Sequence, residues 1–287
     1  MIGFAVIAPL AAALLAQADG ACAAPQGSEA LLDQASGKVL VIGELHGTHE
    51  APQFVDALAC LALQRDDAVV LGVEMSADNQ DRLDAFLDSP GGREARSALL
   101  ASPFWAGRDG RASEAVLDVL DRARMRRAEG EPVDVVALDF GEDDLDLLEA
   151  HGRNGVRDRA MARRALQASH AADQVIVLVG NIHARRTPYR FADRVVETIG
   201  SVTHGDDFVF VETLYGAGEA WNCIMVDGQL ECGTHSTSAD LRPGPPRLLS
   251  EAEAAGLASR QAYDAFVYLG PASAARPARE VYSAPSP

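Results

Sequence analysis

Residues 38–50 read KVLVIGELHGTHE, and this stretch decides the fold that we expect. It begins with a predicted strand at 38–42, in which an uninterrupted apolar run follows Lys38, as is typical of a strand buried on both faces of a parallel sheet. Polar residues follow directly, among them Glu44 and His46. The stretch therefore predicts a buried strand whose carboxyl end leads into a loop with side chains suited to chemistry.

Three further apolar, β-branched runs follow, at 68–73, 133–138 and 175–179. Segments with helical spacing lie between the runs, at 52–64, 113–128 and 154–171, and we expect Ser113 and Asn154 to cap the last two. Such alternation predicts an α/β fold, with a mostly parallel open sheet and flanking helices. Shorter runs at 208–214, 221–226, 230–232 and 265–269 predict a carboxyl-terminal antiparallel hairpin or extension.

The chain has 287 residues, of which 48% are hydrophobic, so it can build a full core. We expect a single α/β domain at 37–270, preceded by a linker at 24–36 and followed by a disordered tail at 271–287. Residues 1–23 resemble a signal peptide, because the apolar run at 2–16 is too short to span a membrane and Ala21-Cys22-Ala23 offers a cleavage pattern. A buried amino-terminal helix and lipidation of Cys22 are the alternatives.

The formal net charge is −17, so we expect no nucleic-acid partner, since an acidic surface repels phosphates. We expect a small-molecule ligand or substrate, a periplasmic or secreted location and no transmembrane segment after signal cleavage. The oligomeric state is left open.

Two of the four cysteines predict a disulfide. Asp227-Gly228 is typical of a two-residue hairpin turn, which would place Cys223 directly opposite Cys232. A cross-strand disulfide is geometrically plausible there and agrees with an oxidising compartment. Of the other two cysteines, we expect Cys60 to be an inert core thiol and Cys22 to leave with the signal peptide.

Polar groups end all four predicted parallel strands. Glu44 and His46 follow the first strand, Glu74 the second, Asp139 the third and His183 the fourth. Ligands bind outside the carboxyl ends of the strands in open α/β sheets, so we expect these side chains to converge. Clustered carboxylates need a cation, which could be an arginine at the start of the last crossover helix, a protonated histidine or a divalent metal ion. Taken alone, Asp139 and Asp158 would be interpreted as helix-start or capping residues.

Four short motifs resemble the erythromycin-esterase/ChaN/Tiki superfamily. They are GELHG at 43–47, Glu74 after the second strand, RDRAMA at 157–162 and GNIHA at 180–184. The exported character and modest length are most similar to its ChaN-like, haem-binding-uptake branch. The resemblance covers roughly residues 38–215. It implies functional roles for Glu44, His46, Glu74, Arg157 and His183. In that superfamily the esterase branch activates water, the Tiki branch resembles a metal-dependent protease and the ChaN branch is associated with haem.

Our leading hypothesis is a hydrolase. His46 would act as general base on a water molecule, while Arg157 and His183 would stabilise the oxyanion. Glu44 or Glu74 would orient that water, or would hold a divalent metal ion together with His46 and His183.

The alternative is a haem- or metal-binding uptake protein without catalysis. Either His49 or Tyr189 would ligate the haem iron, and Phe104 and Trp105 would pack against the macrocycle. A third option is a retired enzyme that serves as a scaffold. The carboxylate-rich site favours the hydrolase, because it would repel the haem propionates, whereas the branch resemblance favours haem.

Overall fold

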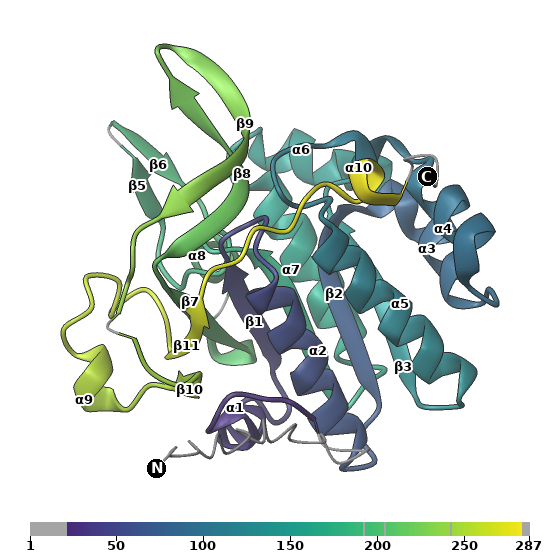
Figure 1. Cartoon of the computed structure of the whole chain (residues 1–287), viewed down its shortest axis with the longest axis horizontal. Coiled ribbons are helices and arrows are strands. Elements are labelled where there is room, and N and C mark those ends of the chain that lie inside the picture. Colours follow the sequence, from purple (N-terminus) through teal and green to yellow (C-terminus); the bar gives the residue numbers. More distant parts are fainter. Residues whose placement is uncertain (1–21, 192, 204, 242, 283–287) are drawn as a thin grey trace, which may run out of the picture.

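The computed structural model describes residues 22–191, 193–203, 205–241 and 243–282. Within these residues the core is a seven-stranded sheet in the order β10-β11-β7-β1-β4-β2-β3 (Figure 1). All neighbouring strands are parallel except β10 and β11. The expected α/β fold with a mostly parallel sheet is therefore confirmed. The strands are β1 (Val39–Glu44), β2 (Val69–Ser76), β3 (Val133–Asp139), β4 (Gln174–Gly180), β7 (Phe208–Gly216), β10 (Arg247–Leu248) and β11 (Ala265–Pro271).

Helices cover both faces of the sheet, as the continuous apolar strands require. Leu40 and Ile42 of β1 face a core shared with α2 (Glu50–Leu63) and α5 (Glu114–Ala128). Val39 and Val41 point the other way, into a core shared with α7 (Val156–Ala168). Successive residues of a strand point to opposite faces, so β1 joins both layers. Figure 1 shows α2 and α5 in front of the sheet and α7 behind it.

The expected cap residue is confirmed for α5 but not for α7. Ser113 caps α5, because its side chain accepts a hydrogen bond from the backbone N–H of Val116. The cap of α7 is Gly155 and not Asn154, because the chain enters that helix through a left-handed residue with φ 70°, which glycine adopts without strain. The remaining helices are α1 (Ser28–Gln34), α3 (Gln80–Leu87), α4 (Gly92–Leu100), α6 (Leu145–His151), α8 (Ile199–Val202), α9 (Glu251–Ala254) and α10 (Ala278–Tyr282).

The carboxyl-terminal strands divide between the sheet and two ribbons. β7 and β11 extend the sheet in parallel, whereas β8 (Gly218–Val226) and β9 (Gln229–Thr237) form a separate antiparallel hairpin that projects beyond it (Figure 1). A smaller hairpin joins β5 (Tyr189–Phe191) and β6 (Arg194–Val196). Cys223 pairs with Cys232 in the β8–β9 register, and a disulfide joins them as predicted. Asp227 and Gly228 both have positive φ, in agreement with the primed turn.

Both flanking segments carry more structure than we expected. The segment 24–36 contains α1, whose Leu31 and Leu32 are fully buried, so it is not a linker. Residues 272–282, which we call the carboxyl-terminal strap, include the buried Ala275 and Ala278 and end in α10, so this part of the expected tail is ordered. Both segments were too short and too rich in alanine to show a periodic apolar pattern. Residues 283–287 lie outside the described residues.

Cys22 and Cys60 also form a disulfide, which corrects the expectation for Cys60. Cys60 is not a free core thiol, because it is bonded to Cys22. It is half-buried on α2, where the amino-terminal segment contacts it. Cys22 would be lost if cleavage followed Ala23, and its sulfur is not free for a lipid. Most of the expected signal peptide, residues 1–21, lies outside the described part of the chain.

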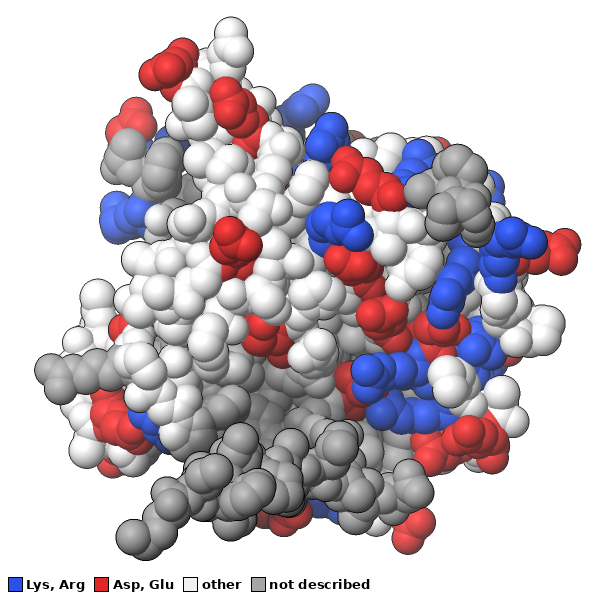
Figure 2. Space-filling view, viewed as in Figure 1, with Lys and Arg blue, Asp and Glu red and all other residues white. Residues whose placement is uncertain are grey.

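Two further expectations concern the charge of the surface and membrane-spanning segments. On the face shown in Figure 2, acidic and basic side chains are interspersed, and the described residues form no extended basic patch there. Among the described helices, none combines the length and apolar character that crossing a membrane requires.

Candidate active site

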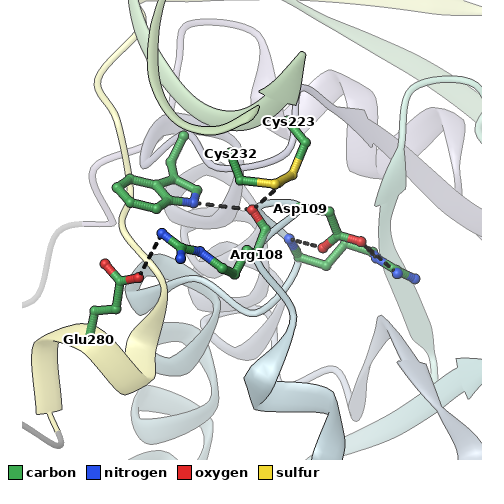
Figure 3. Close-up of a disulfide and its surroundings, with 7 residues drawn as sticks. Arg108, Asp109, Cys223, Cys232 and Glu280 are labelled. Carbon is green, nitrogen blue, oxygen red and sulfur yellow. Dashed lines mark hydrogen bonds and ion pairs between the residues drawn. A yellow bond between two sulfur atoms is a disulfide. The ribbon is translucent and has the colours of Figure 1, made fainter. Parts of the chain in front are cut away.

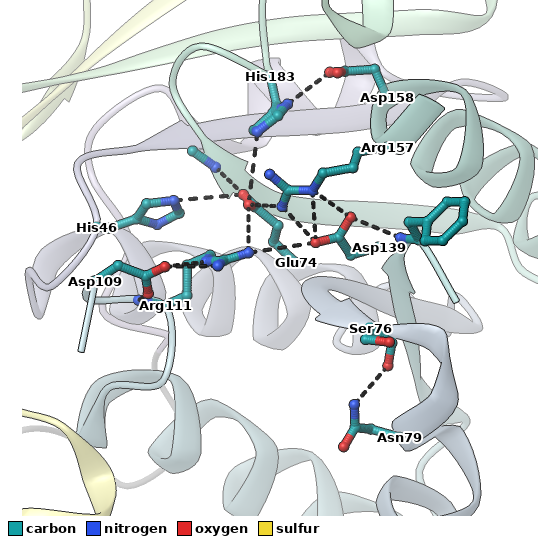
Figure 4. A network of polar contacts seen from close by, with 12 residues as sticks. His46, Glu74, Ser76, Asn79, Asp109, Arg111, Asp139, Arg157, Asp158 and His183 are labelled. Carbon is teal, nitrogen blue, oxygen red and sulfur yellow. Dashed lines mark hydrogen bonds and ion pairs between the residues drawn. The ribbon is translucent and has the colours of Figure 1, made fainter. Parts of the chain in front are cut away.

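The carboxyl ends of β1, β2 and β4, which are neighbours in the sheet, bring the predicted side chains together (Figure 4). Glu44 ends β1 and His46 follows two residues later. Glu74 lies near the end of β2, and His183 lies in the turn after β4. Arg157 enters from the first turn of α7. The convergence expected from the strand ends is therefore present in the structure.

Glu74 lies at the centre of this cluster. One of its carboxylate oxygens, Oε1, accepts a hydrogen bond from Arg157 Nη2 at 2.7 Å, and the other, Oε2, accepts one from the backbone N–H of Gly180 at 2.8 Å. Burial alone would raise the pKa of Glu74, but the nearby His46, His183, Arg157 and Arg111 together lower it to about 2. Glu74 is therefore ionised at neutral pH, so it cannot act as a general acid, and its low pKa makes it a weak general base.

Two histidine–carboxylate pairs flank Glu74. His46 Nδ1 lies 2.8 Å from Glu44 Oε1, and His183 Nδ1 lies 2.8 Å from Asp158 Oδ1. The Nε2 atoms of the two rings face Glu74 from two sides, at 3.6 Å from Oε2 and 3.8 Å from Oε1. A carboxylate on Nδ1 fixes both the orientation and the tautomer of an imidazole. Each ring therefore presents Nε2 as its reactive nitrogen.

The electrostatic environment raises the pKa of both imidazoles above the ordinary histidine value. For His46, burial by itself lowers the pKa, but Glu74 and the hydrogen bond to Glu44 outweigh it. For His183, burial is likewise outweighed, here by the hydrogen bond to Asp158 and by Glu74. Burial raises the pKa of Asp158, although its hydrogen bond to His183 acts in the opposite direction. The site thus holds two bases that are stronger than free histidine.

Arginines provide the positive charge that the carboxylates need. Arg157 Nε donates to the two oxygens of Asp139 at 2.8 and 3.1 Å, in addition to the bond from Arg157 to Glu74. Arg111 Nη1 lies 3.4 Å from Glu74 and 3.5 Å from Asp139, and Arg111 is also paired with Asp109. Burial alone would lower the pKa of Arg157, but Asp139 and Glu74 raise it instead.

The sequence reasoning missed Arg111 and Asp109 and undervalued Asp139 and Asp158. Residues 107–112 belong to no strand or helix, so no periodic pattern placed Arg111 at the site. Asp139 does bond the backbone N–H of Phe140, as a capping residue would, but it also binds Arg157. Its position at the end of a predicted parallel strand placed it at this edge of the sheet, but its bond to Arg157 depends on the folded chain.

The β8–β9 hairpin contacts two loops of the site, the one that carries His46 and the one that carries Arg111. Trp221 donates its backbone N–H to Gly47 O at 2.9 Å and its indole N–H to Arg108 O at 3.1 Å (Figure 3). Cys223 Sγ also lies 3.4 Å from Arg108 O. Gly47 has φ 73°, and a Cβ there would meet Trp221 O at 1.8 Å, so only glycine allows this approach. The loops that carry His46 and Arg111 are thereby held together.

The residues expected to bind haem have other surroundings. His49 precedes α2 and lies 3.7 Å from Glu114, whereas Tyr189 on β5 packs under the guanidinium of Arg185. Within the described residues, no hydrogen bond or ion pair joins either side chain to the cluster around Glu74. Trp105 is fully buried in the core and is therefore not free to pack on a macrocycle. The haem-ligand assignments stay predictions.

The expected divalent metal site does not fit the donors. Within the described ranges, no three His, Cys, Asp or Glu side chains are arranged to hold a metal ion. Both oxygens of Glu74, the carboxylate between the two Nε2 atoms, are already bonded, one to a guanidinium and the other to a backbone amide. Of the three cations that the sequence left open for this site, the structure supplies arginine, and the raised pKa values of His46 and His183 also favour protonated histidine.

The fold is similar to that of an erythromycin esterase of known structure. A mutant of the erythromycin esterase EreC in its open conformation superposes with a TM-score of 0.63 at 13% identity, over 86% of this chain and 94% of that one. A protein from Bacillus cereus gives a TM-score of 0.60 at 13% identity, over 87% and 92%. ChaN of Campylobacter jejuni, solved with cofacially bound haem, gives 0.41 at 14% identity, over 73% and 91%.

These comparisons confirm, at the level of the fold, the superfamily resemblance that the motifs predicted. No protein-family model matches the sequence, and no curated protein matches it. Membership of the ChaN-like branch and kinship with the Tiki branch stay predictions.

Proposed function

We propose that this chain is a hydrolase that activates water between His46 and His183. The observation that carries the proposal is the paired arrangement around Glu74. Two imidazoles, each bonded through Nδ1 to its own carboxylate, direct Nε2 toward the same anion at 3.6 and 3.8 Å. Neither separation is a hydrogen bond, so each Nε2 can exchange a proton with a substrate or a water molecule.

Neutral His46 is the general base in this proposal. Its side chain is 23% exposed, against 16% for His183, so water reaches it more readily. His46 Nε2 takes a proton from water as the water oxygen attacks the carbonyl carbon of an ester or amide, while Glu44 stabilises the imidazolium that forms. His183, protonated at the start, gives its Nε2 proton to the leaving oxygen or nitrogen as the carbonyl bond to it breaks. The products are an acid and an alcohol or amine.

Arg157 stabilises the negative charge that develops on the carbonyl oxygen. Its side chain is 38% exposed although it is bonded to Asp139 and Glu74, so part of the guanidinium is available to a ligand. Glu74 stays ionised throughout and holds the two imidazoles and the arginine in place. No step requires a metal ion.

Two disulfides support a location in an oxidising compartment, and we include the periplasm or the cell exterior in the proposal. A haem- or metal-binding uptake protein without catalysis is the competing proposal. Titration with haemin, followed by absorbance, tests the haem alternative directly.

The test of catalysis is hydrolysis of a panel of 4-nitrophenyl esters and anilides by the wild type and two variants. His46→Asn and His183→Asn should each lose about 10²–10⁴-fold in kcat, the usual contribution of a general acid or base. His170→Asn changes an exposed histidine just beyond α7 and is the matched control. Wild-type inactivity across the panel, or full activity of both site variants with an intact circular dichroism spectrum, would overturn the proposal.

A further inference from the structure

An open cavity of about 550 Å³ adjoins the cluster on the side of Arg157. Three arginines, one aspartate and three apolar side chains line it. The charged residues are Arg111, Arg153, Arg157 and Asp139, and the apolar ones are Phe140, Leu148 and Val156. A cavity of this size holds a small organic ligand, and its mixed lining indicates a ligand that is partly apolar and partly charged.

The arginines of this cavity differ in their partners. Arg157 is bonded to Glu74 and Asp139, and Arg111 is bonded to Asp109, so protein carboxylates balance both. Arg153 is exposed, and no hydrogen bond or ion pair joins it to another residue in the described part of the chain. In a protein of net charge −17, the cavity thus retains one guanidinium without a counter-charge.

Arg157 connects this cavity to the reaction centre. It lines the cavity and donates to Glu74 Oε1, the oxygen that lies 3.8 Å from His183 Nε2. Arg153 lies four positions before Arg157, in the exposed segment that precedes α7. A ligand that spans the cavity can therefore place one end beside the imidazoles and the other near Arg153, with its body against Phe140 and Leu148.

We propose that this cavity binds the acyl part of substrates that carry an anionic group on an apolar chain, and that Arg153 selects for that anion. The inference rests on the proposed hydrolase function and names its substrate class. A carboxylate and a phosphate share the required chemistry, since a guanidinium binds either through paired hydrogen bonds.

The first arm of the test uses two esters that differ at one end. Mono-4-nitrophenyl suberate carries a terminal carboxylate where 4-nitrophenyl octanoate carries a methyl group. The wild type should show the higher kcat/KM with the suberate. Arg153→Ala should lower the suberate-to-octanoate ratio about tenfold, which corresponds to about 1.4 kcal/mol, and Arg153→Lys should retain most of it. Arg82→Ala, which changes an exposed arginine on α3 outside the cavity, is the matched control and should leave the ratio unchanged.

The second arm measures binding without turnover, by calorimetry with octanoate and with inorganic phosphate at constant ionic strength. Binding of octanoate that Arg153→Ala weakens identifies a carboxylate ligand, and binding of phosphate with the same dependence identifies a phosphate ligand. Two results would each overturn this inference, even if the enzyme hydrolyses both esters. One is a suberate-to-octanoate ratio that Arg153→Ala leaves unchanged, and the other is that neither anion binds in a way that depends on Arg153. Arg153-dependent binding by a protein that hydrolyses nothing would instead refute the proposed function and leave the anion site standing.

Discussion

Replacement of Glu74 by glutamine removes one negative charge from between two imidazoles while preserving the shape of the side chain. Arg157 and the Gly180 N–H bond different oxygens of Glu74, so glutamine, with one acceptor oxygen, can accept only one of these two hydrogen bonds. The lost hydrogen bond lies at the carboxyl edge of the sheet, so the sheet core should be intact in Glu74→Gln. The substitution removes the electrostatic interaction of the Glu74 carboxylate with His46 Nε2 and His183 Nε2, which lie 3.6 and 3.8 Å from its oxygens.

The size of the effect follows from these two separations. Two unit charges about 4 Å apart interact by about 1 kcal/mol in bulk water and by about 4 kcal/mol at an effective dielectric constant of about 20. Since one pKa unit corresponds to about 1.4 kcal/mol, the pKa of each imidazole should fall by about 1–3 units. Both rings are partly exposed, at 23% and 16%, so we expect the lower end of that range.

Long-range ¹H–¹⁵N NMR correlation spectra of the imidazoles, recorded against pH, measure both pKa values. Glu129→Gln, a change of an exposed glutamate at the end of α5, is the control and should move neither ring. If the hydrolase proposal holds, the acidic limb of the kcat/KM profile should shift to lower pH with the pKa of His46. Unchanged titration of both rings in a folded Glu74→Gln variant would refute the reasoning that Glu74 sets their basicity.

Further predictions concern stability and processing. The double variant Cys223→Ser/Cys232→Ser should lose about 2–3 kcal/mol in urea unfolding, because the disulfide closes a short ring; an unchanged midpoint would contradict this. Mass spectrometry of the processed protein should find Cys22 retained and disulfide-linked to Cys60, whereas a mature chain that begins at Ala24 would be incompatible with the bond. The lowered pKa of Glu74 adds stability that is fully present above pH 4.5 and is lost as the pH falls through about 2. The raised pKa values of His46 and His183 add stability that is present below about pH 6.5 and is lost as the pH rises through their folded values. The free energy of unfolding measured against pH should therefore fall at both ends, and Glu74→Gln should remove the fall at acidic pH. Gly47→Ala should cost more than about 1 kcal/mol, because its φ is positive and Trp221 O blocks the added carbon; a variant as stable as the wild type would show that the hairpin can move away.

The elements that sequence predicted best have a pattern that is both local and long. β1, β2 and β4 appeared as continuous apolar runs, because burial on both faces leaves little room for polar residues. The run of β3, an edge strand, is interrupted only by the exposed Asp134. The hairpin disulfide followed from its turn, because a two-residue turn sets the register of both strands. The parallel placement of β7 and β11 was not predictable from their short runs alone.

The parts of the site that were missed depend on contacts between segments distant in the chain. His46 and His183 could be predicted because each follows a recognisable strand. Arg111 lies in an irregular loop, and only the folded chain brings it within 3.4 Å of Glu74. Cys22 and Cys60 pair across 38 residues with no turn between them to fix a register. From the sequence alone, a metal ion was one possible source of positive charge for the glutamates, because the number of arginines that would contact them was unknown.

The carboxyl-terminal strap has a consequence for the order in which the site is assembled. In Figure 1 it crosses the carboxyl edge of the sheet between β11 and α10. There Ala275 donates to Gly47 O, Ala278 donates to Ala112 O and Glu280 pairs with Arg108. The loops that carry His46 and Arg111 are thus tied down by residues made more than 150 positions later. Such distant contacts form slowly, and the ribosome makes the strap after both loops. A nascent chain can therefore complete most of its sheet while the loops of His46 and Arg111 are still unrestrained, so the native arrangement of these two side chains should appear in a separate kinetic phase after the β-sheet signal has reached its native value.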